Sequence, residues 1–176
     1  MRIHFAADSG GHELGQALLA RAAAAGHDVA WHGAPEADPG DDYPIYAVRV
    51  GRAVVEDQDQ GVDAFGVLVV EEALCGIVAA NKVNGARAVN PTSPNAAIAA
   101  RQLVDANVLV LAGDAWETNA WLTVNAFVTT AMEHKVDPAR RILQIEEYEN
   151  AGTIEGWAIQ LEPVQIAVQH ERPAGH

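Results

Sequence analysis

The chain has 176 residues, of which 49% are hydrophobic and 20% charged, so it is long enough to bury the core of one domain. Its net charge of −13 argues against nucleic acids and anionic membrane surfaces as partners. A single cysteine excludes an internal disulfide and a cysteine-based zinc site. Neither a signal peptide nor a membrane-spanning run is recognisable, which predicts a cytoplasmic protein.

Short apolar runs alternate with helical segments along the chain, a pattern typical of α/β proteins. The clearest run, at residues 65–70 (F-G-V-L-V-V), is apolar throughout and rich in β-branched residues, so we expect a strand buried on both faces. We predict a three-layer Rossmann-like fold, with helices on both faces of a five-stranded parallel sheet. The predicted strands are residues 2–7, 28–32, 65–70, 87–90 and 107–111. The predicted helices are residues 12–25, 45–56, 76–82, 96–104, 117–132 and 138–150.

The chain divides at about residue 150 into an α/β domain, residues 1–150, and a C-terminal extension, residues 151–176. Apolar residues alternate loosely over residues 153–168, which favours an added strand or hairpin, or an arm on a partner subunit. Residues 170–176 have the composition of a disordered end.

Two carboxylates, Glu71 and Glu72, directly follow the strand predicted at 65–70. Open α/β sheets bind ligands at the carboxyl ends of their strands, so we expect the site at residues 71–76. Two carboxylates held close together raise the pKa of one of them, which creates a general base or acid. Alternatively, they only stabilise the helix N-terminus that follows. Cys75 is either a reactive thiol near that helix N-terminus or a small buried residue.

A glycine-rich turn follows the first predicted strand and begins with Asp8 and Ser9. Either side chain could cap the next helix, and the turn itself could approach an anion. The histidines at positions 4, 12, 27, 32 and 134 show no metal-ligand spacing, so we expect no metal and no cofactor.

Five short motifs occur in the order found in one enzyme family. They are residues 7–14 (A-D-S-G-G-H-E-L), 42–44 (D-Y-P), 77–87 (I-V-A-A-N-K-V-N-G-A-R), 100–108 (with A-R and D-A-N-V) and 140–142 (R-R-I). Over roughly residues 1–150 the chain therefore resembles type B ribose-5-phosphate isomerases and the related galactose-6-phosphate isomerase subunits. The resemblance implies a homodimer or higher homo-oligomer with a site built across the interface. It also implies a small-molecule substrate, bound near Asp8, Ser9, Tyr43, Asn81 and Arg141.

The chain departs from this family at most functional positions. Ser9 and Leu103 match the two histidines that open the sugar ring, and neither can transfer a proton near neutral pH. Asp114 stands where the family often has an arginine. Of a pair of arginines that help to bind phosphate, Asp137 takes the place of the first and Arg141 matches the second. The central loop is also rewritten. Val70 matches the cysteine base of many members, Glu72 a hydroxyl residue, and Gly76 the glutamate base of others.

Two hypotheses follow. In the first, the protein is an isomerase-like enzyme that moves a proton next to a carbonyl, as in aldose–ketose isomerisation. Its substrate would be a small sugar-derived or carbonyl compound other than ribose 5-phosphate, and its base Glu72, with Glu71 or Cys75 as alternatives. In the second, the protein is a catalytically silent subunit or ligand-binding paralogue that pairs with an active isomerase subunit. The surroundings of Glu71 and Glu72 discriminate between the two.

Overall fold

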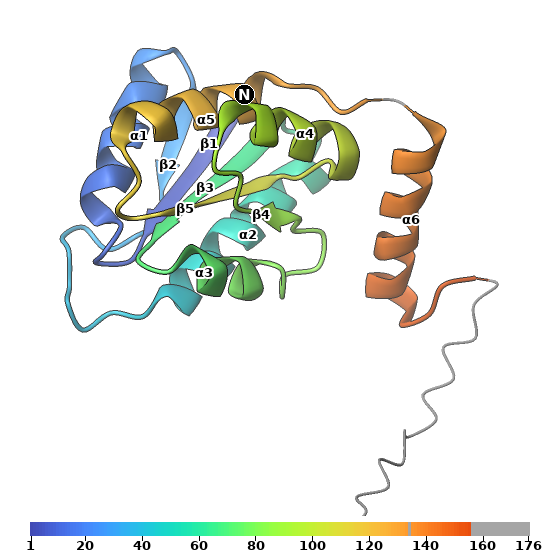
Figure 1. The fold of residues 1–176 in the computed structure, drawn as a ribbon. Coiled ribbons are helices and arrows are strands. Elements are labelled where there is room, and N and C mark those ends of the chain that lie inside the picture. Colours follow the sequence, from blue (N-terminus) through green and yellow to red (C-terminus); the bar gives the residue numbers. More distant parts are fainter. Residues whose placement is uncertain (134, 156–176) are drawn as a thin grey trace, which may run out of the picture.

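A computed structural model describes residues 1–133 and 135–155 (Figure 1). Five parallel strands form one sheet in the order β2-β1-β3-β5-β4. The strands are β1 (Arg2–Ala7), β2 (Asp28–Trp31), β3 (Ala64–Val70), β4 (Ala88–Val89) and β5 (Val108–Ala112). Each coincides with a predicted strand to within two residues at either end, so the predicted fold class is confirmed.

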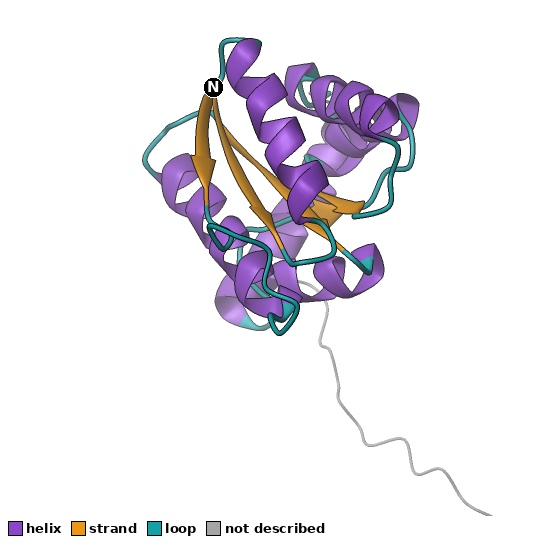
Figure 2. Ribbon diagram, turned by 90° about the vertical axis from the view of Figure 1, so that its left-hand side faces the viewer, coloured by secondary structure: helices purple, strands orange, loops and turns teal. Residues whose placement is uncertain are grey.

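Six helices connect and extend the strands: α1 (His12–Ala24), α2 (Tyr43–Asp59), α3 (Ala73–Ala80), α4 (Pro94–Val104), α5 (Glu117–Thr129) and α6 (Val136–Ala151). Helices α1, α4 and α5 pack on one face of the twisted sheet and α2 and α3 on the other (Figure 2). Helix α3 begins three residues before its predicted start at Gly76. That glycine lies inside the helix, where a Cβ would be 2.8 Å from the Val70 side chain, so it allows α3 to pack closely on the sheet.

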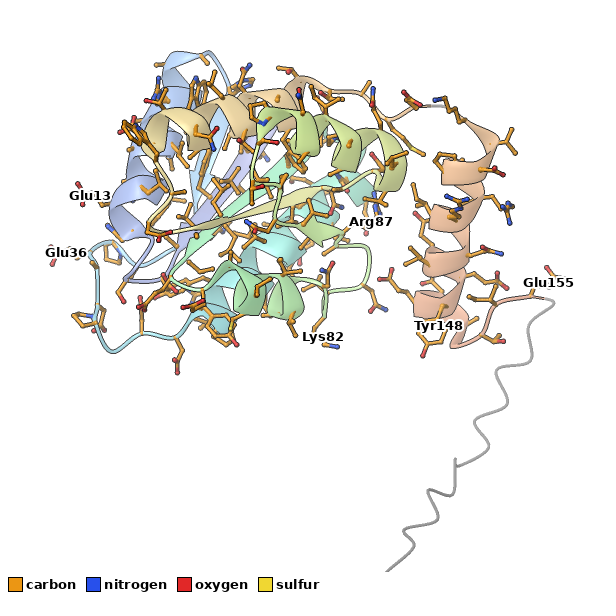
Figure 3. The ribbon with its side chains drawn as sticks, in the orientation of Figure 1. Glu13, Glu36, Lys82, Arg87, Tyr148 and Glu155 are labelled. Atoms are coloured by element: carbon orange, nitrogen blue, oxygen red, sulfur yellow. The ribbon has the colours of Figure 1, made fainter. Side chains whose placement is uncertain are left out.

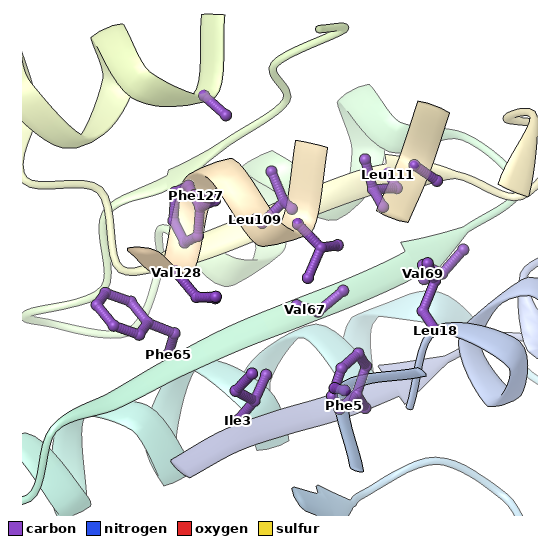
Figure 4. Packing of buried hydrophobic residues seen from close by; sticks show 14 of the residues in the cluster. Ile3, Phe5, Leu18, Phe65, Val67, Val69, Leu109, Leu111, Phe127 and Val128 are labelled. Atoms are coloured by element: carbon purple, nitrogen blue, oxygen red, sulfur yellow. The ribbon is translucent and has the colours of Figure 1, made fainter. Parts of the chain in front are cut away.

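Strand β3 lies at the centre of the sheet, and all its residues are buried. Its side chains alternate between the two cores, as a strand requires. Phe65, Val67 and Val69 join the core beneath α1 and α5 (Figure 4), whereas Leu68 and Val70 join the core beneath α2 and α3. This burial on both faces is what the uninterrupted apolar run predicted.

Helix α6 stands beside the body of the domain (Figure 1). It buries Pro138 and Ile142, and Glu149 near its end accepts hydrogen bonds from Asn84 and from the backbone N–H of Gly85. Residues 156–176 lie outside the described residues, so the proposed extension, its strand or arm and its disordered end stay predictions. Across the part of the chain that is described, no helix is both long and apolar enough to cross a membrane.

Candidate active site

The sheet has a topological switch point between β1 and β3. From β1 the chain passes through α1 to β2 on one side, whereas from β3 it passes through α3 toward β4 on the other side, so the connections that leave these neighbouring strands run in opposite directions. In open α/β sheets this arrangement separates the turns at the carboxyl ends of the strands and leaves a crevice there. The turns after β1, β3 and β5 therefore define the expected place of a ligand.

A pocket of about 680 Å³ lies at this point, which we call the β1–β3 pocket. It is lined by Ser9, Gly10, Ala37, Pro39, Glu71, Glu72, Gly113 and Asp114. Three of the predicted site residues, Ser9, Glu71 and Glu72, are thus brought together from two separate turns. Ala37 and Pro39 come from the β2–α2 loop, residues 32–42, which has no regular pattern and was not predicted to contribute.

Glycines allow the three turns of the pocket to touch through their backbones. A Cβ on Gly10 would lie 2.7 Å from the Cβ of Glu71. A Cβ on Gly113 would collide with the carbonyl group of Gly10, lying 2.7 Å from its carbon atom. Any larger residue at either position would push the turns apart.

Asp8 ties the first turn to the third strand. Its carboxylate is buried and accepts hydrogen bonds from the backbone N–H of Gly11 at 2.9 Å and of Glu71 at 3.1 Å. It does not cap α1, whose N-cap residue Gly11 has no side-chain cap. Asp8 therefore positions Glu71 and does not itself line the β1–β3 pocket.

Asp41 plays a similar part for Ser9 and was missed by the sequence analysis. One carboxylate oxygen accepts the backbone N–H of Ser9 at 3.0 Å, and the other accepts the hydroxyl of Tyr46 at 2.9 Å. Burial and the hydrogen bond to Asp41 together raise the pKa of Tyr46. At the other end of the β2–α2 loop, the carbonyl of Ala34 accepts the indole N–H of Trp31. The loop is thus fixed at both ends.

Glu71 and Glu72 are both exposed, and both line the pocket. In a continued strand the two side chains would face opposite ways, but β3 ends at Val70 and strand alternation stops there. Glu72 is the N-cap residue of α3, but its side chain makes no cap hydrogen bond. Neither carboxylate has a side-chain partner among the described residues. A capping hydrogen bond therefore does not explain their presence, whereas their charges still lie near the N-terminus of α3, where the helix dipole stabilises them.

The other candidate residues lie outside the β1–β3 pocket. Cys75 is half-buried within α3, and Tyr43 packs against the core beneath α2 and α3. The Asn81 side chain pairs with the backbone of Ala88, donating at 3.0 Å and accepting at 2.8 Å. Arg141 is exposed on α6, which stands at the opposite end of the molecule from the loop carrying Glu36 (Figure 3). Within one chain, Arg141 therefore does not reach the pocket.

A second pocket, of about 430 Å³, lies between the C-terminal part of α2, residues 84–87 and α6. Arg87 at its wall is already paired with Asp105 at 2.9 Å and with the carbonyl of that residue. We place the candidate site in the β1–β3 pocket because it lies at the switch point of the sheet, where strand ends and glycine turns converge.

Comparison with known proteins shows which family shares this fold. Ribose-5-phosphate isomerase B of Mycolicibacterium paratuberculosis (strain ATCC BAA-968 / K-10) is 32% identical over 150 residues, which cover 85% of this chain and 92% of that protein. The structure of ribose-5-phosphate isomerase B from Mycoplasma genitalium with bound ribulose-5-phosphate matches with a TM-score of 0.79 and 29% identity, covering 85% of this chain and 97% of that one. The structure of a ribose 5-phosphate isomerase from Thermotoga maritima matches with a TM-score of 0.76 and 31% identity, covering 83% of this chain and 97% of that one.

The matched region spans every strand and all but the last turns of α6. Residues 3–145 match the family described as Ribose/Galactose Isomerase. The fold over this region is thus shared with these proteins. The chain belongs to the Ribose/Galactose Isomerase family.

Proposed function

We propose that the protein is an aldose–ketose isomerase that works in the β1–β3 pocket with Glu72 as its base. The observation that carries this proposal is that two carboxylates without side-chain partners, Glu71 and Glu72, line a pocket at the switch point of an isomerase-family fold. Paired carboxylates supply general acid and base groups, whereas a silent subunit has no need of them.

The proposed reaction moves one proton between adjacent carbons. The Glu72 carboxylate removes a proton from the carbon next to the carbonyl, and the bond electrons form an enediolate with negative charge on the former carbonyl oxygen. The protonated Glu72 then returns the proton to the former carbonyl carbon, which exchanges the positions of carbonyl and hydroxyl. Because both events occur on one face of a planar intermediate, a single carboxylate is sufficient. Glu71 lines the same pocket and would move the proton between the two oxygens, while the Ser9 hydroxyl would hydrogen-bond one of them.

Isomerisation of sugars in D₂O, followed by NMR, tests the proposal. An active enzyme converts aldose to ketose and incorporates deuterium at the carbon next to the carbonyl. Glu72→Gln keeps the size of the side chain and should lower the rate by at least about 100-fold. Glu56→Gln is the matched control, because Glu56 lies on α2 and pairs with Arg52 on the surface.

Other outcomes would redirect the assignment. A fully active Glu72→Gln variant together with an inactive Cys75→Ser variant would make Cys75 the base. If neither change affects the rate, or no substrate reacts, the silent-subunit hypothesis replaces the enzymatic one.

Ribose 5-phosphate itself should be a poor substrate. Ser9 and Leu103 stand where the resemblance implies ring-opening histidines, and each missing acid or base typically lowers a rate by about 10²–10⁴. Asp114 lines the pocket where the resemblance implies an arginine. A turnover number near ~10 s⁻¹, typical of enzymes, in a coupled ribulose 5-phosphate assay would contradict this expectation.

The proposed enzyme acts as a homodimer. Helix α3 is almost wholly apolar, yet Leu74 and Val78 on its outer side are 73% and 61% exposed. Leu143 and Tyr148 on α6 are also more than half exposed. A second copy that covers such surfaces would form an interface of at least about 1,200 Å² in total, the size of a stable contact.

A further inference from the structure

Four backbone donors in the turns around the β1–β3 pocket already have partners within the protein. Anions that bind at strand-to-helix turns depend on free backbone N–H groups. Here four such groups have internal partners: Gly11 and Glu71 donate to Asp8, Ser9 donates to Asp41, and Gly113 donates to the carbonyl of Val70 at 2.8 Å. The fixed carboxylates of Asp8 and Asp41 thus hold three of these donors, which are then not available to a substrate anion.

The charged groups of the pocket have one sign. Its lining includes the carboxylates of Glu71, Glu72 and Asp114 and, among the described residues, no lysine or arginine. The guanidinium of Arg49 lies over the Tyr46 ring, 5.9 Å from its centroid, and does not line the pocket. A phosphate ester carries about −1.5 to −2 charges near neutral pH, so each of these carboxylates would repel it.

The same groups suit a ligand that offers hydroxyl hydrogens. Ionised carboxylates only accept hydrogen bonds, and the Ser9 hydroxyl can either donate or accept. A volume of about 680 Å³ is within the usual range for small-molecule sites. A polyhydroxylated, uncharged molecule therefore complements both the hydrogen-bonding character and the charge of the pocket.

We infer that the β1–β3 pocket takes a free, unphosphorylated sugar, and that Asp41 and Asp114 are the residues that reject its phosphate ester. Asp41 does so by holding its negative charge against the Ser9 N–H, and Asp114 does so by placing a negative charge on the pocket wall. This inference rests on the proposed function in taking the pocket as the substrate site. It adds the chemical class of the substrate and the residues that select it.

Binding of matched ligand pairs tests the inference without requiring turnover. D-ribose and D-ribose 5-phosphate, and D-galactose and D-galactose 6-phosphate, are titrated by ligand-observed NMR at about 20 mM and about 500 mM salt. At low salt each ester should bind at least about 10-fold more weakly than its free sugar, and high salt should reduce the difference because it screens charge.

Three single-charge variants assign the effect to residues. Asp114→Asn and Asp41→Asn should each reduce the difference by at least about 2-fold, since each removes one negative charge and retains the shape. Asp63→Asn is the matched control. Asp63 is an exposed residue that precedes β3 at the other end of the sheet, and its substitution should leave the difference unchanged. Urea unfolding confirms that the variants are folded.

The outcomes are separable from those of the isomerase assay. A sugar that binds with the expected preference but is not isomerised refutes the proposed function and supports this inference. An ester that binds as tightly as its free sugar overturns the inference, as does the absence of binding by all four ligands. If an ester binds more tightly and Arg141→Gln removes that preference, phosphate is held from α6, which also overturns it.

Discussion

At the scale of single residues, Gly113 sets the distance between the turn after β5 and the turn after β1. Gly113→Ala would place a methyl group against the carbonyl of Gly10, where backbone and not a flexible side chain must move. We expect the free energy of unfolding to fall by about 1–3 kcal/mol, as for other overpacked sites. Urea denaturation measures this change. Gly40→Ala is the control, because its Cβ would make only an ordinary contact, 3.4 Å from Asp38, and an unchanged Gly113→Ala protein would contradict the prediction.

The Asp41–Tyr46 pair offers a spectroscopic test of the pocket's supporting contacts. Burial and the hydrogen bond to Asp41 raise the pKa of Tyr46, so Asp41→Asn should lower that pKa by removing the charge and weakening the bond. Absorbance of the tyrosinate as a function of pH, with Tyr46→Phe to assign the signal, measures the change. Asp42→Asn serves as the control, since Asp42 makes no side-chain cap at the start of α2. Equal titration of both variants would disprove the coupling.

Some of these residues could be predicted from the sequence and others could not. Glu71 and Glu72 were placed in the pocket because they follow a strand whose apolar run fixes its end. Asp41 is 32 residues from Ser9, and their contact depends on the path of an irregular loop that carries no periodic signal. The sequence pattern indicated the pocket at the end of β3, but it could not identify which side chains bind the backbone around it.

At the scale of elements, a chain of hydrogen bonds joins β1, the end of β2 and α2. His4 lies 2.9 Å from His32 and 3.0 Å from Asp57, which Arg2 also contacts at 3.2 Å. Burial lowers the pKa of His32, helped by the charges of His4 and Arg49, whereas Asp57 opposes the shift. For Asp57 burial acts to raise the pKa, but hydrogen bonds from His4 and Arg2 hold it below its usual value.

This network makes the edge of the sheet sensitive to acid. Because His32 binds its proton less readily when folded, the unfolded chain gains protons first and stability falls as the pH drops below about 6.5. The lowered pKa of Asp57 acts in the same direction only below about pH 4. Between pH 7.5 and 5.5, wild type should lose more unfolding free energy in urea than His32→Gln. His27→Gln should behave as wild type, and identical losses in all three proteins would refute the role of His32.

The helices were predictable because apolar spacing and end signals agree. The Ser93 hydroxyl accepts the backbone N–H of Ala96 at 3.2 Å, which is the contact expected of a serine at the N-cap of α4. Helix α3 was misplaced by three residues because glycine was read as a boundary, whereas Gly76 is required for close packing against Val70. Burial of this kind depends on tertiary contacts, which a single sequence does not contain.

At the scale of the whole molecule, the exposed apolar side chains of α3 predict self-association. Light scattering should give about twice the chain mass of 18.6 kDa at micromolar concentration. Val78→Glu should shift the protein toward the monomer, because it buries an unpaired charge in the proposed interface. Leu122→Glu on α5, a similarly exposed position, is the control. A monomeric wild-type protein would exclude the dimer.

The backbone contact between Gly10 and Gly113 also determines how the pocket can move. Because no side chain separates them, the turns after β1 and β5 are in direct backbone contact and must move together. Glu71, in the turn after β3, is coupled to them through its contact with Gly10. Pressure from a ligand on one turn is therefore transmitted to the other two. Among the described segments that line the pocket, the part of the β2–α2 loop between Ala34 and Asp41 can move independently of the three turns. Hydrogen bonds hold the loop at these two residues. Any opening or closing of the pocket would therefore fall to this segment, while the turns after β1, β3 and β5 keep their spacing.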